Sequence, residues 1–320
     1  MGRFSGDGRR SWLVVMIGLL FVLAAVGSYF AYKHAADPAP PRQAFPAALP
    51  AAPASYIGLY ERGVPGSYAG VTSFTRETGV RPQIVTYYSG WFQPFSTSFA
   101  KAAEAHGAVP LVQINPAGVS VTAIASGRYD GYLITYAEAV RAHRLPVILS
   151  FGHEMNGSWY SWGYHHTPPK VFVAAWQHIV NVFRTVGARN VTWLWTINAF
   201  AATDNTIPSP AAWWPGRSYV TWVGLDGYYR QQSDQFVTMF GPTITVVREL
   251  TTKPILIAET AAAQAVGQPG KIADLFAGVK KYELLGFVWF DNNAERNYAM
   301  TRAAQAAMRL GGTAYREPVP

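Results

Sequence analysis

The chain has 320 residues, of which 50% are hydrophobic, 14% are aromatic and only 14% are charged. This composition predicts a large buried core and a surface with little charge. The net charge of +8 is spread thinly, without a basic run interleaved with aromatics, so nucleic acid is not an expected partner. The absence of cysteine excludes disulfides, thiol catalysis and cysteine-ligated metals.

The N-terminal segment predicts a membrane anchor. Residues 1–11 carry three arginines, and an uncharged run follows from Trp12 to Tyr32. At about 1.5 Å per residue, a helix over 12–32 spans roughly 30 Å, the hydrocarbon core of a bilayer. The arginine excess places the N-terminus in the cytoplasm, and therefore the rest of the chain outside a single-pass cell-membrane anchor. The alternative is a cleaved signal peptide and a secreted product, although the apolar part of such peptides usually has only ~7–15 residues.

A linker follows the anchor. Residues 37–54 contain six prolines among alanines, a composition that favours an extended, semi-rigid spacer over helix or sheet. We therefore assign residues 33–54 to a Pro/Ala-rich linker and residues 55–320 to a single folded domain.

The domain alternates short apolar runs with helical patterns. The runs are Tyr56–Tyr60, Gln83–Tyr88, Pro110–Asn115, Pro146–Ser150, Asn190–Asn198, Trp222–Leu225, Pro254–Glu259 and Gly286–Phe290. Runs that are apolar throughout are typical of parallel strands covered on both faces. Eight such units predict an α/β fold, the (β/α)8 or TIM barrel. The main alternative is an open doubly wound sheet, but no glycine-rich phosphate loop follows the first run.

The segment Thr167–Ala188 carries the clearest helical pattern. We expect Thr167 to cap this helix, Pro168 to be its first residue and Gly187 to end it. The last helix is expected from about Asn297 to Leu310, where two glycines should stop it.

Two glutamates stand at the ends of predicted strands. Glu154 follows the fourth strand, and Glu259 ends the seventh. Barrel enzymes form their sites at the carboxyl ends of the strands, so we expect the two side chains to meet. A retaining glycosidase needs such a pair: one protonated carboxyl group as acid, and one carboxylate about 5–5.5 Å away as nucleophile. A salt-bridge role is the plain alternative for either glutamate alone.

Six further residues are predicted to bind substrate. They are His153, Trp159, Trp162, Asp226, Tyr228 and Trp289. His153 stands beside the predicted acid, where it could donate to a sugar hydroxyl or to the second carboxylate. The tryptophans offer faces on which sugar rings stack, although Trp289, with its apolar neighbours, could equally belong to the core. Tyr228 could donate to the nucleophile, and the alternative for Asp226 and Tyr228 is a turn with a buried tyrosine.

No metal is expected from the spacing of the histidines. A zinc site of the His-Glu-x-x-His type would need a histidine at position 157, where the chain has Gly157. His165 and His166 have no partner at metal-ligand spacing.

At these residues the chain resembles glycoside hydrolase family 26, best known for β-mannanases. The likeness is most specific at His153–Gly157 with Trp159 and Trp162, then at Asp226–Tyr228 and Ile257–Glu259. The resemblance implies a cofactor-free, endo-acting, retaining enzyme with Glu154 as acid/base and Glu259 as nucleophile. It also implies that Trp159 and Trp289 hold sugars on either side of the cleaved bond.

One position departs from the family pattern. Mannanases of this family usually carry an arginine three residues before the histidine, and this chain has Ser150. We expect β-1,4-mannan as the substrate, with mixed-linkage β-glucan, β-1,3-xylan or an endogenous exopolysaccharide as alternatives. A different class, a non-catalytic membrane-anchored glycan-binding protein, is the remaining alternative, and it would not need two neighbouring glutamates.

Overall fold

The computed structural model describes residues 49–200, 206–292 and 297–316. They belong to one compact unit, Phe45–Pro320. The predicted anchor Trp12–Tyr32 and the linker up to residue 48 lie outside the described residues. Within the described part of the chain, no helix is both long and apolar enough to cross a bilayer.

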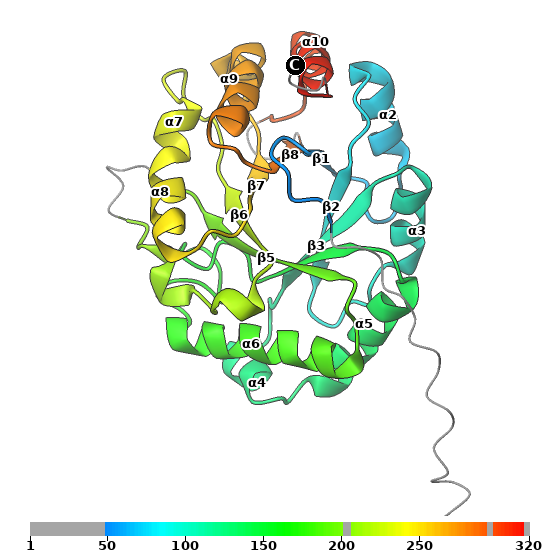
Figure 1. Cartoon of the computed structure of the whole chain (residues 1–320), viewed down its shortest axis with the longest axis vertical. Helices are drawn as coiled ribbons and strands as arrows, with labels where there is room; N and C mark the ends of the chain where they lie inside the picture. The colour runs from blue at the N-terminus through cyan, green and yellow to red at the C-terminus, as the bar shows by residue number, and fades with distance from the viewer. Residues whose placement is uncertain (1–48, 201–205, 293–296, 317–320) are drawn as a thin grey trace, which may run out of the picture. The chain divides into compact units, whose positions relative to one another are not determined.

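Eight parallel strands close into a barrel in chain order (Figure 1). They are β1 (Tyr56–Glu61), β2 (Ile84–Gly90), β3 (Val109–Asn115), β4 (Val147–Phe151), β5 (Val191–Asn198), β6 (Trp222–Asp226), β7 (Ile255–Thr260) and β8 (Gly286–Asp291). β1 pairs with β8 from Tyr56 opposite Gly286 to Glu61 opposite Asp291, which closes the cylinder. The barrel prediction is therefore confirmed, the strand bounds are correct to within two residues, and the open-sheet alternative is wrong.

Helices surround the barrel (Figure 1). They are α2 (Ala69–Thr78), α3 (Thr97–Ala105), α4 (Val121–Ala125), α5 (Asp130–His143), α6 (Pro169–Val186), α7 (Phe236–Met239), α8 (Gly241–Leu250), α9 (Gln268–Lys281) and α10 (Arg302–Arg316). Short 3-10 turns η1 (Pro210–Trp213), η2 (Arg217–Tyr219) and η3 (Gln264–Val266) lie in the connections. Each strand exposes alternate side chains to the barrel interior and to the helices, so both faces of the sheet are buried.

The start of α6 corrects one prediction. Thr167 does not cap the helix: its hydroxyl donates to the carbonyl of Ser161 at 3.0 Å. Pro168, with an extended ψ of 137°, is the capping residue, and Pro169 begins the helix. The proline pair therefore shifts the start by one residue. The predicted end is confirmed, because Gly187 adopts the left-handed conformation (φ 82°).

The last helix corrects a second prediction. α10 begins at Arg302 and runs through Gly311 and Gly312 to Arg316 instead of stopping at the glycines. A Cβ atom at Gly311 would lie 2.2 Å from the Phe276 ring, and one at Gly312 would lie 2.7 Å from Val80. These glycines therefore serve close packing of the helix against its neighbours, and they do not terminate it.

Candidate active site

The carboxyl ends of the strands surround a cavity of about 870 Å³, within the usual range for small-molecule and sugar sites. It is lined by Tyr60, Tyr88, His153, Glu154, Trp159, Tyr160, Asn198, Thr206, Ile207, Tyr228, Arg230, Glu259, Phe290, Asn292 and Tyr298. Five of the eight predicted site residues line the cavity: His153, Glu154, Trp159, Tyr228 and Glu259. Polar and aromatic groups dominate the lining, which suits a ligand with both hydroxyl groups and apolar faces.

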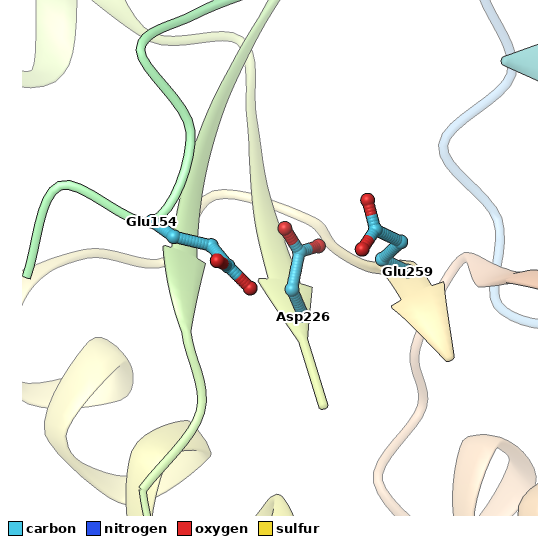
Figure 2. Close-up of side chains that lie close together, drawn as sticks. All are labelled: Glu154, Asp226 and Glu259. Carbon is cyan, nitrogen blue, oxygen red and sulfur yellow. The ribbon is translucent and has the colours of Figure 1, made fainter. Parts of the chain in front are cut away.

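Three carboxyl groups meet at the carboxyl ends of the strands, and two of them, those of Glu154 and Glu259, line the cavity. Glu154 lies three residues beyond β4, Asp226 is the last residue of β6, and Glu259 lies near the end of β7. One carboxylate oxygen from each lies within 4.8 Å of the others. Figure 2 shows Asp226 between the two glutamates. The structure therefore brings together the two glutamates that the sequence places about a hundred residues apart.

Glu154 is held in a specific conformation. Its backbone φ of 54° is in the left-handed region, which residues other than glycine rarely adopt. The backbone N–H donates to the carbonyl of Thr196 at 3.0 Å, and the side-chain Oε2 accepts from Nε1 of Trp159 at 2.7 Å. Burial raises the pKa of Glu154 to about 7, although the Trp159 bond and the Arg230 charge each lower it. Near neutral pH this carboxyl group can therefore both give and take a proton.

Glu259 has a different environment. Its Oε1 accepts a hydrogen bond from the Tyr88 hydroxyl, and its Oε2 accepts one from the Tyr228 hydroxyl. Burial, and then the nearby Asp226 and Glu154 carboxyl groups, raise the pKa of Tyr228 well above its ordinary value, so this phenol keeps its proton. Two phenol donors favour the ionised form of Glu259 and fix both of its oxygens.

Asp226 is fully buried and does not line the cavity, so it cannot reach a sugar as predicted. Neither of its carboxylate oxygens has a hydrogen-bond partner among the described residues. Burial, and then the neighbouring Glu154, raise the pKa of Asp226 well above its ordinary value, which favours the neutral acid. The three carboxyl oxygens lie close enough to share a divalent cation. Protons compete with a cation here, because burial favours the protonated forms of Asp226 and Glu154.

His153 is almost fully buried, and both of its ring nitrogens have protein partners. Nδ1 lies 3.0 Å from Oδ1 of Asn115, and Nε2 lies 3.2 Å from the Tyr160 hydroxyl. Since an amide oxygen only accepts, Nδ1 donates and Nε2 accepts from Tyr160. Burial lowers the pKa of His153 to about 3, so the ring is neutral. The predicted bond from His153 to the second carboxylate is absent among the described contacts, and the histidine instead orients Tyr160.

The two tryptophans after Glu154 have different places. Trp159 is 50% exposed and lines the cavity, as a stacking platform requires. Trp162 is 3% exposed and lies outside the lining. Its ring stacks on Tyr160 at 4.3 Å, and its Nε1 donates to the carbonyl of His153 at 2.9 Å. The prediction of Trp162 as a sugar platform is therefore corrected: its buried ring packs against Tyr160 and fixes the loop that follows β4.

Strand alternation corrects Trp289. Its side chain is fully buried in the larger core cluster, between the barrel and the helices, and does not line the cavity. Phe290, the next residue of β8, faces the cavity and stacks on Tyr60 with ring centroids 4.4 Å apart. The aromatic surface predicted for Trp289 is thus supplied by its neighbour.

Several lining residues were not predicted from the sequence. Tyr60 and Tyr88 close predicted strands, Tyr160 lies in the loop after Glu154, and Arg230 follows Tyr228 by two residues. Their common signal is an aromatic or charged residue at or just beyond the end of an apolar run, which is where a barrel builds its site.

Ser150 occupies the strand position where the family pattern has arginine. It is fully buried inside the barrel, and its hydroxyl lies 3.0 Å from that of Thr196. A neutral pair therefore stands on this part of the barrel wall, close to the carboxyl cluster.

A closed (β/α)8 barrel with paired glutamates beyond β4 and on β7, under an aromatic cavity, defines a glycoside hydrolase of the barrel type. Residues 124–308 match the sequence profile of glycosyl hydrolase family 26, and the chain belongs to this family.

Two curated relatives are named as an endoglucanase and a beta-1,3-xylanase. The chain is 27% identical over 273 residues to Endoglucanase H of Acetivibrio thermocellus, which covers 80% of this chain but 29% of the relative. It is 27% identical over 175 residues to beta-1,3-xylanase TXYA of a Vibrio species, covering 51% of this chain and 36% of the relative. The chain thus spans about a third of the length of these relatives.

Solved structures share the fold. The mannanase man26 of Bacillus subtilis superposes with a TM-score of 0.61 at 16% identity, covering 80% of this chain and 85% of that one. An endo-beta-1,4-mannanase double mutant from Cellulomonas fimi gives a TM-score of 0.64 at 17% identity, covering 81% and 70%.

Proposed function

We propose that this protein is an endo-acting hydrolase of β-linked polysaccharide that retains the anomeric configuration, with Glu154 as acid/base and Glu259 as nucleophile. The observation that carries the proposal is the difference between two neighbouring carboxyl groups. Both are buried, but Glu154 accepts a hydrogen bond from the Trp159 indole, while Glu259 accepts from two phenols. Environments that separate the protonation states of two carboxyl groups are the basis of this acid–nucleophile pairing.

In the first step, Glu154 gives its proton to the oxygen of the bond being cleaved. The carboxylate of Glu259 attacks the anomeric carbon, and the bond to the leaving sugar breaks. The Trp159 N–H bond supports this step because it stabilises Glu154 once the proton has left. In the second step, Glu154 takes a proton from water, and that oxygen displaces Glu259 from the sugar.

The aromatic rings support polymer binding. Trp159 offers an exposed ring next to the acid, and Phe290 with Tyr60 offers a stacked pair on the other wall. Rings on both sides of the carboxyl pair suit a chain of sugars that extends across the cleaved bond, as an endo-acting enzyme requires.

The substrate proposed first is β-1,4-mannan, on the family resemblance of the sequence. A β-glucan is the second candidate, and two observations favour it. Ser150 replaces the arginine usual in the mannanases, and the relative that matches 80% of this chain is named an endoglucanase. Both candidates use the same two carboxyl groups and differ only in the sugar that the cavity accepts.

The test is product analysis of the purified protein with β-1,4-mannan, glucomannan, mixed-linkage β-glucan and β-1,3-xylan. Short oligosaccharides from one polymer, absent with Glu259→Gln, would establish both the enzyme class and the substrate. Proton NMR during hydrolysis should show the β-anomer first. Initial release of the α-anomer would refute the retaining mechanism, and tight binding of a glycan without any product would favour a binding protein.

A rescue experiment tests the assignment of the two glutamates. Glu154→Ala should lose most activity on polymer, but added azide should restore part of the rate on aryl glycosides with good leaving groups, and the product should be the β-glycosyl azide. Glu259→Ala should instead yield an α-glycosyl azide, because the anion would then attack from the nucleophile's side. The reversed pattern would exchange the two roles.

A further inference from the structure

The two ends of the barrel carry different charge. Five of the helices end with a cation in the last turn: Arg76 in α2, Arg141 in α5, Arg184 in α6, Arg248 in α8, and Lys280 with Lys281 in α9. These ends lie opposite the cavity, because each helix runs antiparallel to the strands and the cavity is at the strands' carboxyl ends. We call this end of the molecule the base, defined as the seven connections from a helix or 3-10 turn into β2 to β8, each counted from the last helical turn.

The base carries eleven Arg and Lys against four Asp and Glu. At the opposite end, the described connections from each strand to the first turn of the next helix, with the α4–α5 and η3–α9 links, carry six Arg and Lys against three Asp and Glu. The last residues of the strands add four acidic residues there: Glu61, Asp226, Glu259 and Asp291. The positive charge of the described part of the chain is therefore concentrated at the base.

Helix stability explains part of this pattern, because cations favour the negative end of the helix dipole. It does not explain the cations beyond the helix ends. Arg189 and Lys253 lie in the loops after α6 and α8, three residues beyond the helix ends, whereas Arg144 is the exposed C-cap of α5. Within the described residues, no ion pair within 4.0 Å involves these three cations or Lys280. The base thus presents a positive field to its surroundings.

The chain enters the barrel at the base. Leu49 packs against the apolar cluster at the lower end of the barrel interior. The carbonyl of Pro50 accepts from the Tyr56 hydroxyl at 2.7 Å, and the N–H of Ala54 donates to the carbonyl of Leu284 at 2.8 Å. These contacts fix residues 49–54 beside the first residues of β1 and β8. Leu49, the first residue that the structure describes, therefore lies at the basic end of the barrel.

We propose that the base is a docking surface for an anionic phospholipid bilayer. One observation and one prediction support this partner. The observation is the excess of cations on the end of the barrel where Leu49 lies, and the prediction is the membrane anchor expected from the sequence that precedes Leu49. Basic side chains near an anionic bilayer each strengthen binding, by about fivefold per charge. Docking on the base turns the cavity away from the lipid, toward polymer in the surrounding medium.

The experiment uses the full chain and its lack of cysteine, since one introduced cysteine gives a unique labelling site. Ala142→Cys carries a fluorophore at the base, and Gln232→Cys carries it beside the cavity; both positions are exposed. The labelled proteins are mixed with vesicles that contain a headgroup quencher, made of phosphatidylcholine alone or of an equimolar mixture with phosphatidylglycerol. The predicted anchor would hold the chain to either kind of vesicle, so we expect stronger quenching of the base label on the anionic vesicles than on the neutral ones, with this difference removed at high salt.

Charge reversal provides the matched comparison. The triple variant Arg144→Glu, Arg189→Glu, Lys280→Glu should weaken docking of the base at least about 100-fold, so its base label should be quenched no more on anionic than on neutral vesicles. The control triple, Arg62→Glu, Arg128→Glu, Lys170→Glu, changes charge equally at the other end and should bind nearly as the parent does. All six side chains are exposed, and both triples should hydrolyse soluble substrate at the parent rate.

Three results would overturn the proposal. The first is equal quenching of the base and cavity labels, and the second is equal quenching on neutral and anionic vesicles. The third is a response of the base label to soluble polyphosphate but not to vesicles, which would identify a free polyanion as the partner.

Discussion

The indole N–H of Trp159 donates to Oε2 of Glu154 at 2.7 Å, so the exposed aromatic ring and the proposed acid form one unit. The bond favours the ionised form of the carboxyl group, whereas burial favours the neutral form. A sugar that stacks on Trp159 would therefore contact a group that lowers the pKa of Glu154.

This contact predicts a shift in the pH profile. The acid must be protonated, so kcat/KM should fall as pH rises through the Glu154 pKa of about 7. Trp159→Phe keeps a ring but removes the donor, so the pKa should rise and the alkaline limb should move to higher pH. If the alkaline limb lay at the same pH in parent and variant, Glu154 would not be the group whose titration causes the fall in kcat/KM.

Tyr228→Phe removes one of the two donors to Glu259. We expect kcat to fall roughly 100-fold with little change in KM, as for loss of one aligned donor in other enzymes. Tyr229→Phe is the matched control: its hydroxyl lies 3.2 Å from Asp274, away from the glutamates, so kcat should stay near the parent value. Equal losses in both variants would indicate a general effect of the substitutions on packing.

Adjacent residues of β8 should behave differently. Phe290→Ala removes half of the stacked pair with Tyr60 and should raise KM, by about tenfold for a lost aromatic contact of ~1.5 kcal/mol. Trp289→Phe should lower the melting temperature and leave KM unchanged, because Trp289 is fully buried behind the strand. A higher KM with Trp289→Phe would indicate that Trp289 contacts the substrate after all.

Asp226→Asn should stabilise the protein at neutral pH. The pKa of Asp226 is raised in the folded state, so the folded protein holds a proton that the unfolded chain releases above about pH 4. Stability therefore falls as pH rises from that value, by up to about 1.4 kcal/mol per pH unit. Asparagine does not titrate, so its advantage in melting temperature should be absent near pH 3 and should grow toward pH 7. A constant difference across this range would refute a raised pKa.

Gly311→Ala should destabilise α10, although alanine is the better helix former. Its Cβ would lie 2.2 Å from the Phe276 ring, an overlap that costs about 1–3 kcal/mol. Gly131→Ala in α5 is the control, because nothing lies within 4 Å of the added Cβ, and it should be neutral or stabilising. Denaturant unfolding of both variants measures the difference.

The fold was predictable because parallel strands covered on both faces are apolar without interruption, and this chain has eight such runs. The glutamate pair was predictable for a related reason: Glu154 and Glu259 are charged residues at the ends of apolar runs, where a barrel collects its strand ends.

The other site residues were harder to predict for a physical reason. Successive residues of a strand face opposite sides of the sheet, and a run that is apolar throughout does not show which residues face the barrel interior. The sequence Gly286–Asp291 therefore does not tell whether Trp289 or Phe290 faces the cavity. Asp226 and Tyr228 lie two residues apart on the same end of β6, yet only Tyr228 reaches Glu259 through a hydrogen bond. That selection depends on side-chain direction in the closed barrel, which local sequence does not specify.

The two phenols that hold Glu259 come from β2 and from the chain just beyond β6, while Glu259 itself belongs to β7. Three separate parts of the cylinder thus share one small cluster, and none of them can separate without breaking it. Partial opening of the barrel would abolish activity before any large loss of helical structure. Turnover is therefore a more sensitive gauge of barrel integrity than a measure of secondary structure.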